Sequence, residues 1–223
     1  MGEPVSESNF KVTHLILVPS LITLGITILR VVGELQHWSP MFFGRVAGGG
    51  GAIVGISWLP IIFGPYFALK LAGSGQPPTR VGKAIGFAVL ALLVYFAGGL
   101  VGFAPQLQFP GKEAIGYLIM AGGAVLVFWG WPALFRTLLA YAYAARIPVA
   151  IVMFFAIRGN WGTHYDALPP ENHGPADLWP KYFQIGLLPQ LIFWVAFTVI
   201  VGALFGSIAS ALVRRGKTAP QQT

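Results

Sequence analysis

Six long stretches with almost no charged residues run through this chain, separated by short loops. A bilayer core about 30 Å thick requires roughly 20 apolar residues per helical span, so each stretch is long enough to cross. Charged residues make up 9% of the 223-residue chain, against roughly 25% in an ordinary soluble domain. The sequence therefore predicts an all-α, polytopic transmembrane helix bundle that forms one integral membrane domain over residues 1–223. The expected spans are residues 12–32, 48–70, 84–104, 114–130, 132–157 and 184–213, with an outer loop over residues 158–182.

The distribution of basic residues predicts the orientation of the bundle. With six spans and a cytoplasmic N-terminus, eight Lys and Arg residues fall on the cytoplasmic side and five on the other. Because cytoplasmic loops carry an excess of Lys and Arg, this bias favours both termini in the cytoplasm of a multi-pass protein of the inner (plasma) membrane. The eight are Lys11, Lys70, Arg80, Lys83, Arg136, Arg214, Arg215 and Lys217, and the five are Arg30, Arg45, Lys112, Arg158 and Lys181.

The fourth and fifth spans depend on one tight turn. Between residues 114 and 157 only Arg136 and Arg146 interrupt the apolar run, which is too long for a single span. Gly130-Trp131-Pro132 supplies the turn, because Gly suits the end of one helix and Pro the first turn of the next. A single crossing here would move the basic C-terminal residues outside, which the orientation rule disfavours.

Arg146 is the one charged residue expected near the middle of a span. A centred Arg costs at least about 2.5 kcal/mol and usually faces a cavity or a partner. No Asp or Glu lies inside an expected span, so we expect no intramembrane salt bridge and a preference of Arg146 for an anionic ligand. Tyr143 and the backbone opened at Pro148 would complete the site. The alternative is that Pro148 breaks the helix and leaves Arg146 at an interface.

Prolines occur at matching places in the two halves of the chain. Pro60 and Pro65 lie in the second span and Pro148 in the fifth, which are the middle spans of two sets of three with inverted topology. Proline-interrupted helices at such positions are typical of the midplane site of a transporter. These prolines therefore join the candidate substrate site, although Pro is also common in membrane helices.

The outer loop gathers polar residues that could recognise a ligand. His164, Asp166 and His173 combine imidazole with carboxylate, a ligand set that suits Zn²⁺ or Mn²⁺. Their spacing matches no metal signature, so we expect no metal site. The alternatives for this loop are ligand recognition or gating, and an ordered polar cap without a ligand.

Small residues recur at four-residue spacing in three of the spans. This spacing places small side chains on one helix face and lets backbones approach closely. The alternative to internal packing is a face for self-association or for a partner subunit. The residues are Gly51 and Gly55, Gly98 and Gly102, and Gly202, Gly206 and Ser210.

Signatures of enzymes, cofactors and nucleic-acid binding are not found. The chain has no Cys, which excludes disulfides and thiolate chemistry, and the Gly48–Gly51 run lacks the Lys-Ser/Thr of a phosphate-binding loop. We therefore expect a non-enzymatic, transporter-like helix bundle in the lipid bilayer, a small permease or channel for an anionic solute, without catalytic residues, cofactor or nucleic-acid partner. The alternative is a structural or assembly subunit that packs through its small-residue faces against a second copy or partner membrane subunits.

Overall fold

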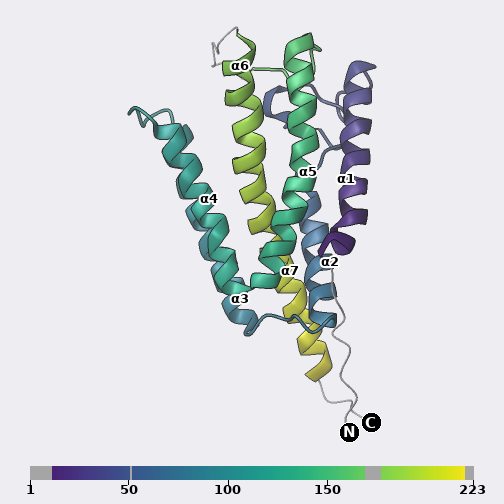
Figure 1. Ribbon diagram of the computed structural model, residues 1–223, viewed down its shortest axis with the longest axis vertical. Helices are drawn as coiled ribbons and strands as arrows, with labels where there is room; N and C mark the ends of the chain where they lie inside the picture. Colours follow the sequence, from purple (N-terminus) through teal and green to yellow (C-terminus); the bar gives the residue numbers. More distant parts are fainter. Residues whose placement is uncertain (1–11, 51, 169–176, 219–223) are drawn as a thin grey trace.

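The structure, a computed structural model, describes residues 12–50, 52–168 and 177–218, which form a bundle of helices (Figure 1). Two segments, Tyr182–Leu187 and Pro189–Phe193, are π-helical, and they belong to one continuous rod, Leu178–Arg214. The prediction of an all-helical bundle is confirmed. In chain order the elements are α1 (Val12–Leu35), η1 (Ala47–Gly49), α2 (Leu59–Gly73), α3 (Val81–Phe103), α4 (Lys112–Gly130), α5 (Pro132–Gly159), α6 (Leu178–Lys181), η2 (Tyr182–Leu187), η3 (Pro189–Phe193) and α7 (Trp194–Thr218).

Five helices in the described part of the chain are long and apolar enough to cross a membrane. Their outward faces carry large apolar side chains, such as Leu93, Leu100 and Leu118, which are 62%, 66% and 72% exposed. Apolar surface of this extent is stable in contact with lipid and not with water. The chain is therefore a multi-pass membrane protein. The five are α1, α3, α4, α5 and the continuous rod Leu178–Arg214.

The second predicted span differs from the structure. The sequence predicts a helix over residues 48–70, whereas α2 begins only at Leu59, after the short η1 turn and irregular backbone. Gly48 and Gly49 have φ angles of 75° and 72°, which end a helix and which Gly adopts without strain. At 1.5 Å per residue α2 alone spans about 22 Å, less than the thickness of a bilayer core.

Hydrogen bonds satisfy part of the irregular backbone before α2, both within the segment and from α1. The N–H of Ile53 donates to the carbonyl of Met41 at 3.2 Å, and Arg30 donates to the carbonyls of Gly44 and Gly49 at 3.2 and 3.1 Å. In Figure 1 this segment runs behind α5, between α1 and the α6–α7 rod. Non-helical backbone at membrane depth is tolerated only where protein satisfies it or where it borders a water-filled cavity.

The turn between α4 and α5 lies where the Gly-Trp-Pro sequence predicts it. α4 ends at Gly130 and α5 begins at Pro132, so only Trp131, in an extended conformation (φ −154°, ψ 90°), separates the two helices. The indole N–H of Trp131 donates to the carbonyl of Gln76 at 3.0 Å. This bond fixes the turn to the loop between α2 and α3.

Glycine contacts join α3 to α4 and α2 to α7. A methyl group added at Gly98 of α3 would lie 2.8 Å from the carbonyl oxygen of Gly116 in α4, and Gly102 lies against the same residue. A methyl group at Gly206 of α7 would lie 2.7 Å from the carbonyl oxygen of Gly64 in α2. These helix backbones approach so closely because the glycines at the points of contact have no side chain.

Two further small residues of α7 are also buried within the chain. A methyl group at Gly202 would lie 2.5 Å from the side chain of Leu138 in α5, and Ser210 is 2% exposed. Gly51 lies outside the described residues. The small-residue face of α7 is thus occupied by α2 and α5.

The two ends of the bundle lie at the bottom and at the top of Figure 1. α1 begins and α7 ends toward the same end of the bundle, at the bottom of Figure 1, while α1 and α5 end at the top, where α6 also lies. The α3–α4 hairpin leans away from α6 as it approaches the loop that joins α3 to α4. The site described below lies in this upper half.

Candidate functional site

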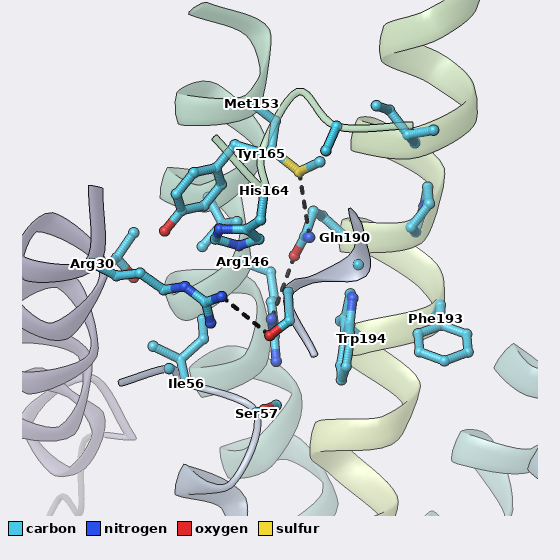
Figure 2. Close-up of a pocket in the computed structure, with 18 of the residues that line it drawn as sticks. Arg30, Ile56, Ser57, Arg146, Met153, His164, Tyr165, Gln190, Phe193 and Trp194 are labelled. Carbon is cyan, nitrogen blue, oxygen red and sulfur yellow. Dashed lines mark hydrogen bonds between the residues drawn. The ribbon is translucent and has the colours of Figure 1, made fainter. Parts of the chain in front are cut away.

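A cavity of about 440 Å³ lies inside the bundle, bordered by α1, α5, the irregular segment before α2, the π-helical segments and the facing ends of α3 and α4. Of its 23 lining residues ten carry polar or titratable side chains, ten are apolar and three are glycine, and its volume falls within the range of small-molecule sites. Figure 2 shows part of the lining. The polar and titratable lining side chains are Thr27, Arg30, Ser57, Glu113, Tyr117, Arg146, His164, Tyr165, Gln184 and Gln190.

Arg146 lies near the middle of the 28-residue α5 and lines this cavity. The residue is only 4% exposed, and no carboxylate among the described residues forms an ion pair with it. Its Cζ atom lies 4.8 Å from the centre of the Trp194 ring, a cation–π arrangement. Its Nε atom is buried without a hydrogen-bond partner. Arg146 is therefore a buried cation without a countercharge.

Gln190 is the one polar side chain among the described residues that hydrogen-bonds to Arg146. Nη1 of Arg146 donates to Oε1 of Gln190 at 3.4 Å, and Nε2 of Gln190 donates to the sulfur of Met153 at 3.4 Å (Figure 2). The first distance is long for an N–H···O bond, and thioether sulfur is a weak acceptor. Both the guanidinium and the amide therefore retain capacity for a ligand.

The π-helical segments bring several side chains to the cavity wall. Leu188 N–H donates to the carbonyl of Phe183 in the π pattern, and Pro189 has no N–H to offer to the carbonyl of Gln184, five residues earlier. Gln184, Pro189 and Gln190 all line the cavity. π-helical turns of this kind are frequent at functional sites.

A second charged cluster joins α1 to the loop after α5. Oε1 of Glu34 accepts from Nε of Arg30 at 2.8 Å and lies 2.5 Å from Nδ1 of His164. Oε2 of Glu34 accepts from the backbone N–H of His164 at 2.8 Å. Glu34 is 1% exposed. The charges of Arg30 and Glu34 thus compensate each other at close range.

The environment of His164 favours its neutral form. Burial lowers the pKa of His164, and the nearby Arg30 acts in the same direction, while the hydrogen bond to Glu34 opposes both. In the neutral form Nδ1–H donates to Glu34 and Nε2 is an acceptor. Burial likewise raises the pKa of the neighbouring Tyr165, so this phenol is also neutral.

Asp166 organises the loop that carries His164. Its carboxylate accepts from the backbone N–H groups of Gly162 and Thr163 at 2.9 and 2.8 Å and from the hydroxyl of Thr163 at 2.7 Å. Asp166 is 8% exposed and does not line the cavity. Its role in the structure is to close the loop. His173 lies outside the described residues.

The other residues of the predicted site lie apart from the cavity. Tyr143 is 40% exposed on the outer face of α5, and Pro148 is half-buried one position before the lining residue Val149. Pro60 is buried in the first turn of α2 and Pro65 is half-buried further along it. None of these four lines the cavity, whereas Arg146, His164 and Gly55 do.

The structure also corrects the prediction that no acid lies inside a span. Glu34 belongs to α1, which continues to Leu35, and it forms a buried ion pair with Arg30. The sequence analysis placed Arg30 and Glu34 on the outer side of the membrane. Their spacing of four residues, with opposite charges, is the helical ion-pair pattern that could have revealed the pair. Gln190 and Trp194 carry no comparable signal.

Comparison of the chain with known protein families, with curated proteins and with solved structures gives no match.

Proposed function

We propose that this protein is a small permease- or channel-like bundle that binds an anionic solute in its internal cavity through Arg146. The observation that carries the proposal is a buried guanidinium without a carboxylate partner among the described residues, located midway along a membrane helix and bordering a cavity. A cation at the centre of a membrane costs at least about 2.5 kcal/mol. An anionic ligand with hydrogen-bond acceptors would offset that cost.

The surroundings of Arg146 support binding of an anion. Trp194 holds one face of the guanidinium, while the weak bond to Gln190 and the unpartnered Nε leave donors for a carboxylate or phosphate-like group. A guanidinium presents its N–H groups as a fork that matches two carboxylate oxygens. The amide N–H₂ of Gln190, held only by sulfur, could donate to the same group.

The irregular backbone around the cavity supports movement of the solute. The irregular segment before α2 and the π-helical segments before α7 both border the cavity. Discontinuous helices at a midplane site are a recurring feature of secondary transporters. The alternative role, an assembly subunit packed through small-residue faces, has less support because the described small residues of α3 and α7 are already occupied within the chain.

We also propose that both termini lie in the cytoplasm of the inner (plasma) membrane. The excess of basic residues on that side motivates the assignment. Reporter fusions after residue 223 and within residues 158–181 should give opposite sidedness, cytoplasmic and external respectively. An external C-terminus would overturn the orientation.

Anion binding can be tested with the purified full-length chain. Hexanoate and 3-phenylpropionate should raise the melting temperature of the wild-type protein and should have no effect on Arg146→Gln, which keeps a hydrogen-bonding side chain. Arg158→Gln, which removes an exposed charge at the end of α5, is the control and should respond as the wild type does. A folded Arg146→Gln variant with the full anion response would overturn the proposal.

Movement of the solute needs a separate measurement. Vesicles containing the protein should take up benzenesulfonate, which is permanently charged and does not cross lipid as a neutral acid. Arg146→Gln should abolish that uptake and Arg158→Gln should retain it. Binding without uptake would favour the subunit alternative over a permease.

A further inference from the structure

We infer that the solute of this cavity is a zwitterion, whose anionic group binds Arg146 and whose organic ammonium group lies toward Glu113. The inference rests on the proposed function and adds the substrate class. Glu113 belongs to the first turn of α4, where it is exposed, and it lines the same cavity as the buried Arg146.

The formal charges on the wall reduce to two that are not compensated. The lining includes Arg30, Arg146, Glu113 and His164. Arg30 is paired with the buried Glu34, and His164 donates to the same carboxylate. Burial lowers the pKa of His164, so it adds no charge at neutral pH. One cation, Arg146, and one anion, Glu113, remain.

These two charges do not neutralise each other or find partners nearby. Neither Arg146 nor Glu113 forms an ion pair with any described residue. Lys112, which precedes Glu113, instead donates its ammonium to the carbonyls of Ala104 and Leu107 at 3.2 and 2.8 Å. A cavity with separated, unpaired charges of opposite sign is complementary to a ligand that carries both signs.

Aromatic rings form a continuous strip between the two charges. Tyr117 lies one helical turn after Glu113, and its ring centre is 5.5 Å from that of Phe103. Phe103 lies 6.4 Å from Phe193, and Phe193 lies 5.0 Å from Trp194, which covers Arg146. We call these four residues, Tyr117, Phe103, Phe193 and Trp194, the aromatic strip.

The aromatic strip suits the remainder of such a solute. All four of its residues line the cavity, and Figure 2 shows Phe193 and Trp194 side by side on the wall near Arg146. Ring faces pack against an apolar body and attract an organic ammonium. A solute with an apolar body between a carboxylate and an amine would therefore contact every part of this wall.

Matched pairs of probes isolate the contribution of the ammonium group to binding. 3-[4-(Aminomethyl)phenyl]propionate and 3-phenylpropionate share a body and a carboxylate, and only the first carries an ammonium at the opposite end. The pair of 6-aminohexanoate and hexanoate makes the same comparison with a flexible chain. Binding of each probe to the full-length protein would be measured by calorimetry at neutral pH, where both amines are protonated.

The wild-type protein should bind at least one zwitterion about tenfold more tightly than its matched anion, the effect of one favourable charge contact of ~1.4 kcal/mol. Glu113→Gln should remove this preference without weakening the anion. Asp177→Asn, which changes an exposed acid outside the cavity, should keep it. If both anions bind as tightly as their zwitterions, or if the preference survives in Glu113→Gln, the inference is wrong. Loss of the proposed function has a different signature, namely anion binding that is unchanged in Arg146→Gln.

Discussion

The guanidinium of Arg146 lies over the indole of Trp194, with 4.8 Å between Cζ and the ring centre. α5 and α7 meet through this contact beside the cavity. The contact matters because a cation without a carboxylate partner needs another electronegative surface, and an indole face is the best that an apolar side chain supplies.

Replacement of Trp194 should therefore weaken both the fold and the site. In a desolvated setting a cation–π contact is worth about 2 kcal/mol, so Trp194→Leu should lower the melting temperature and reduce the stabilisation by hexanoate. Trp129→Leu, at an exposed position of α4, is the matched control and should change neither. An anion response that is unaltered in Trp194→Leu would show that the indole does not position the guanidinium.

The buried pair of Arg30 and Glu34 gives a second prediction. Glu34→Gln leaves the guanidinium of Arg30 buried without its countercharge, which should destabilise the protein by about 3–5 kcal/mol. The double variant Arg30→Met, Glu34→Gln removes the unpaired charge and should recover much of that loss, as measured by thermal unfolding. The single variant Arg30→Met completes the comparison. If the double variant is destabilised by as much as Arg30→Met and Glu34→Gln added together, the two side chains are not coupled in the way the distances indicate.

His164 should make stability depend on pH. Burial lowers the pKa of His164 in the folded protein, whereas an exposed imidazole in the unfolded chain titrates at about 6.5. The unfolded chain then takes up a proton that the folded protein does not. Stability should be full above about pH 6.5 and should fall as the pH drops below it, by at most about 1.4 kcal/mol per pH unit.

A pair of His variants isolates this effect. Melting temperatures between pH 8 and pH 5 should fall less steeply for His164→Gln than for the wild type, while His14→Gln, changed at an exposed position near the start of α1, should follow the wild type. A wild-type protein as stable at pH 5 as at pH 8 would contradict the assignment of His164 as neutral.

Close packing of α7 against α2 gives a further prediction. A side chain at Gly206 would overlap the carbonyl oxygen of Gly64 and the Cβ atom of Ala68, at 2.7 and 3.0 Å from the added Cβ. Gly206→Leu should therefore lower the free energy of unfolding by about 1–3 kcal/mol or more. Gly122→Leu is the control, because an added Cβ there has open space around it. Equal melting temperatures for the two variants would show that α2 and α7 are not packed as described.

Much of the helical framework could be predicted from hydropathy. The predicted bounds of α1, α3, α4 and α5 lie within three residues of those observed, because long apolar runs have few stable alternatives in lipid. The second stretch was predicted as one helix because hydropathy does not distinguish a helix from irregular backbone whose polar groups are hydrogen-bonded within the protein. The glycine run at Gly48–Gly51 and the bonds donated by Arg30 decide between them, and the latter depend on the folded structure.

The candidate site was predictable only in part. The rarity of charge inside a span led to Arg146. Tyr143 and Pro148 followed from their proximity to Arg146 in the sequence, and Pro60 and Pro65 from the matching places of prolines in the two halves; none of these four lines the cavity. Gln190 and Trp194 are 44 and 48 residues further along the chain from Arg146. Their arrival at the same cavity depends on how α7 packs on α5, which no local pattern in the sequence encodes.

The most direct test of the central claim is to locate a bound anion in crystals of the protein grown with 6-bromohexanoate. Anomalous scattering from bromine identifies the ligand independently of the protein density. We predict a bromine peak inside the cavity and the carboxylate within hydrogen-bond distance of Arg146. A well-ordered cavity without bromine, at a concentration that raises the melting temperature, would contradict the account, as would bromine peaks confined to the outer surface.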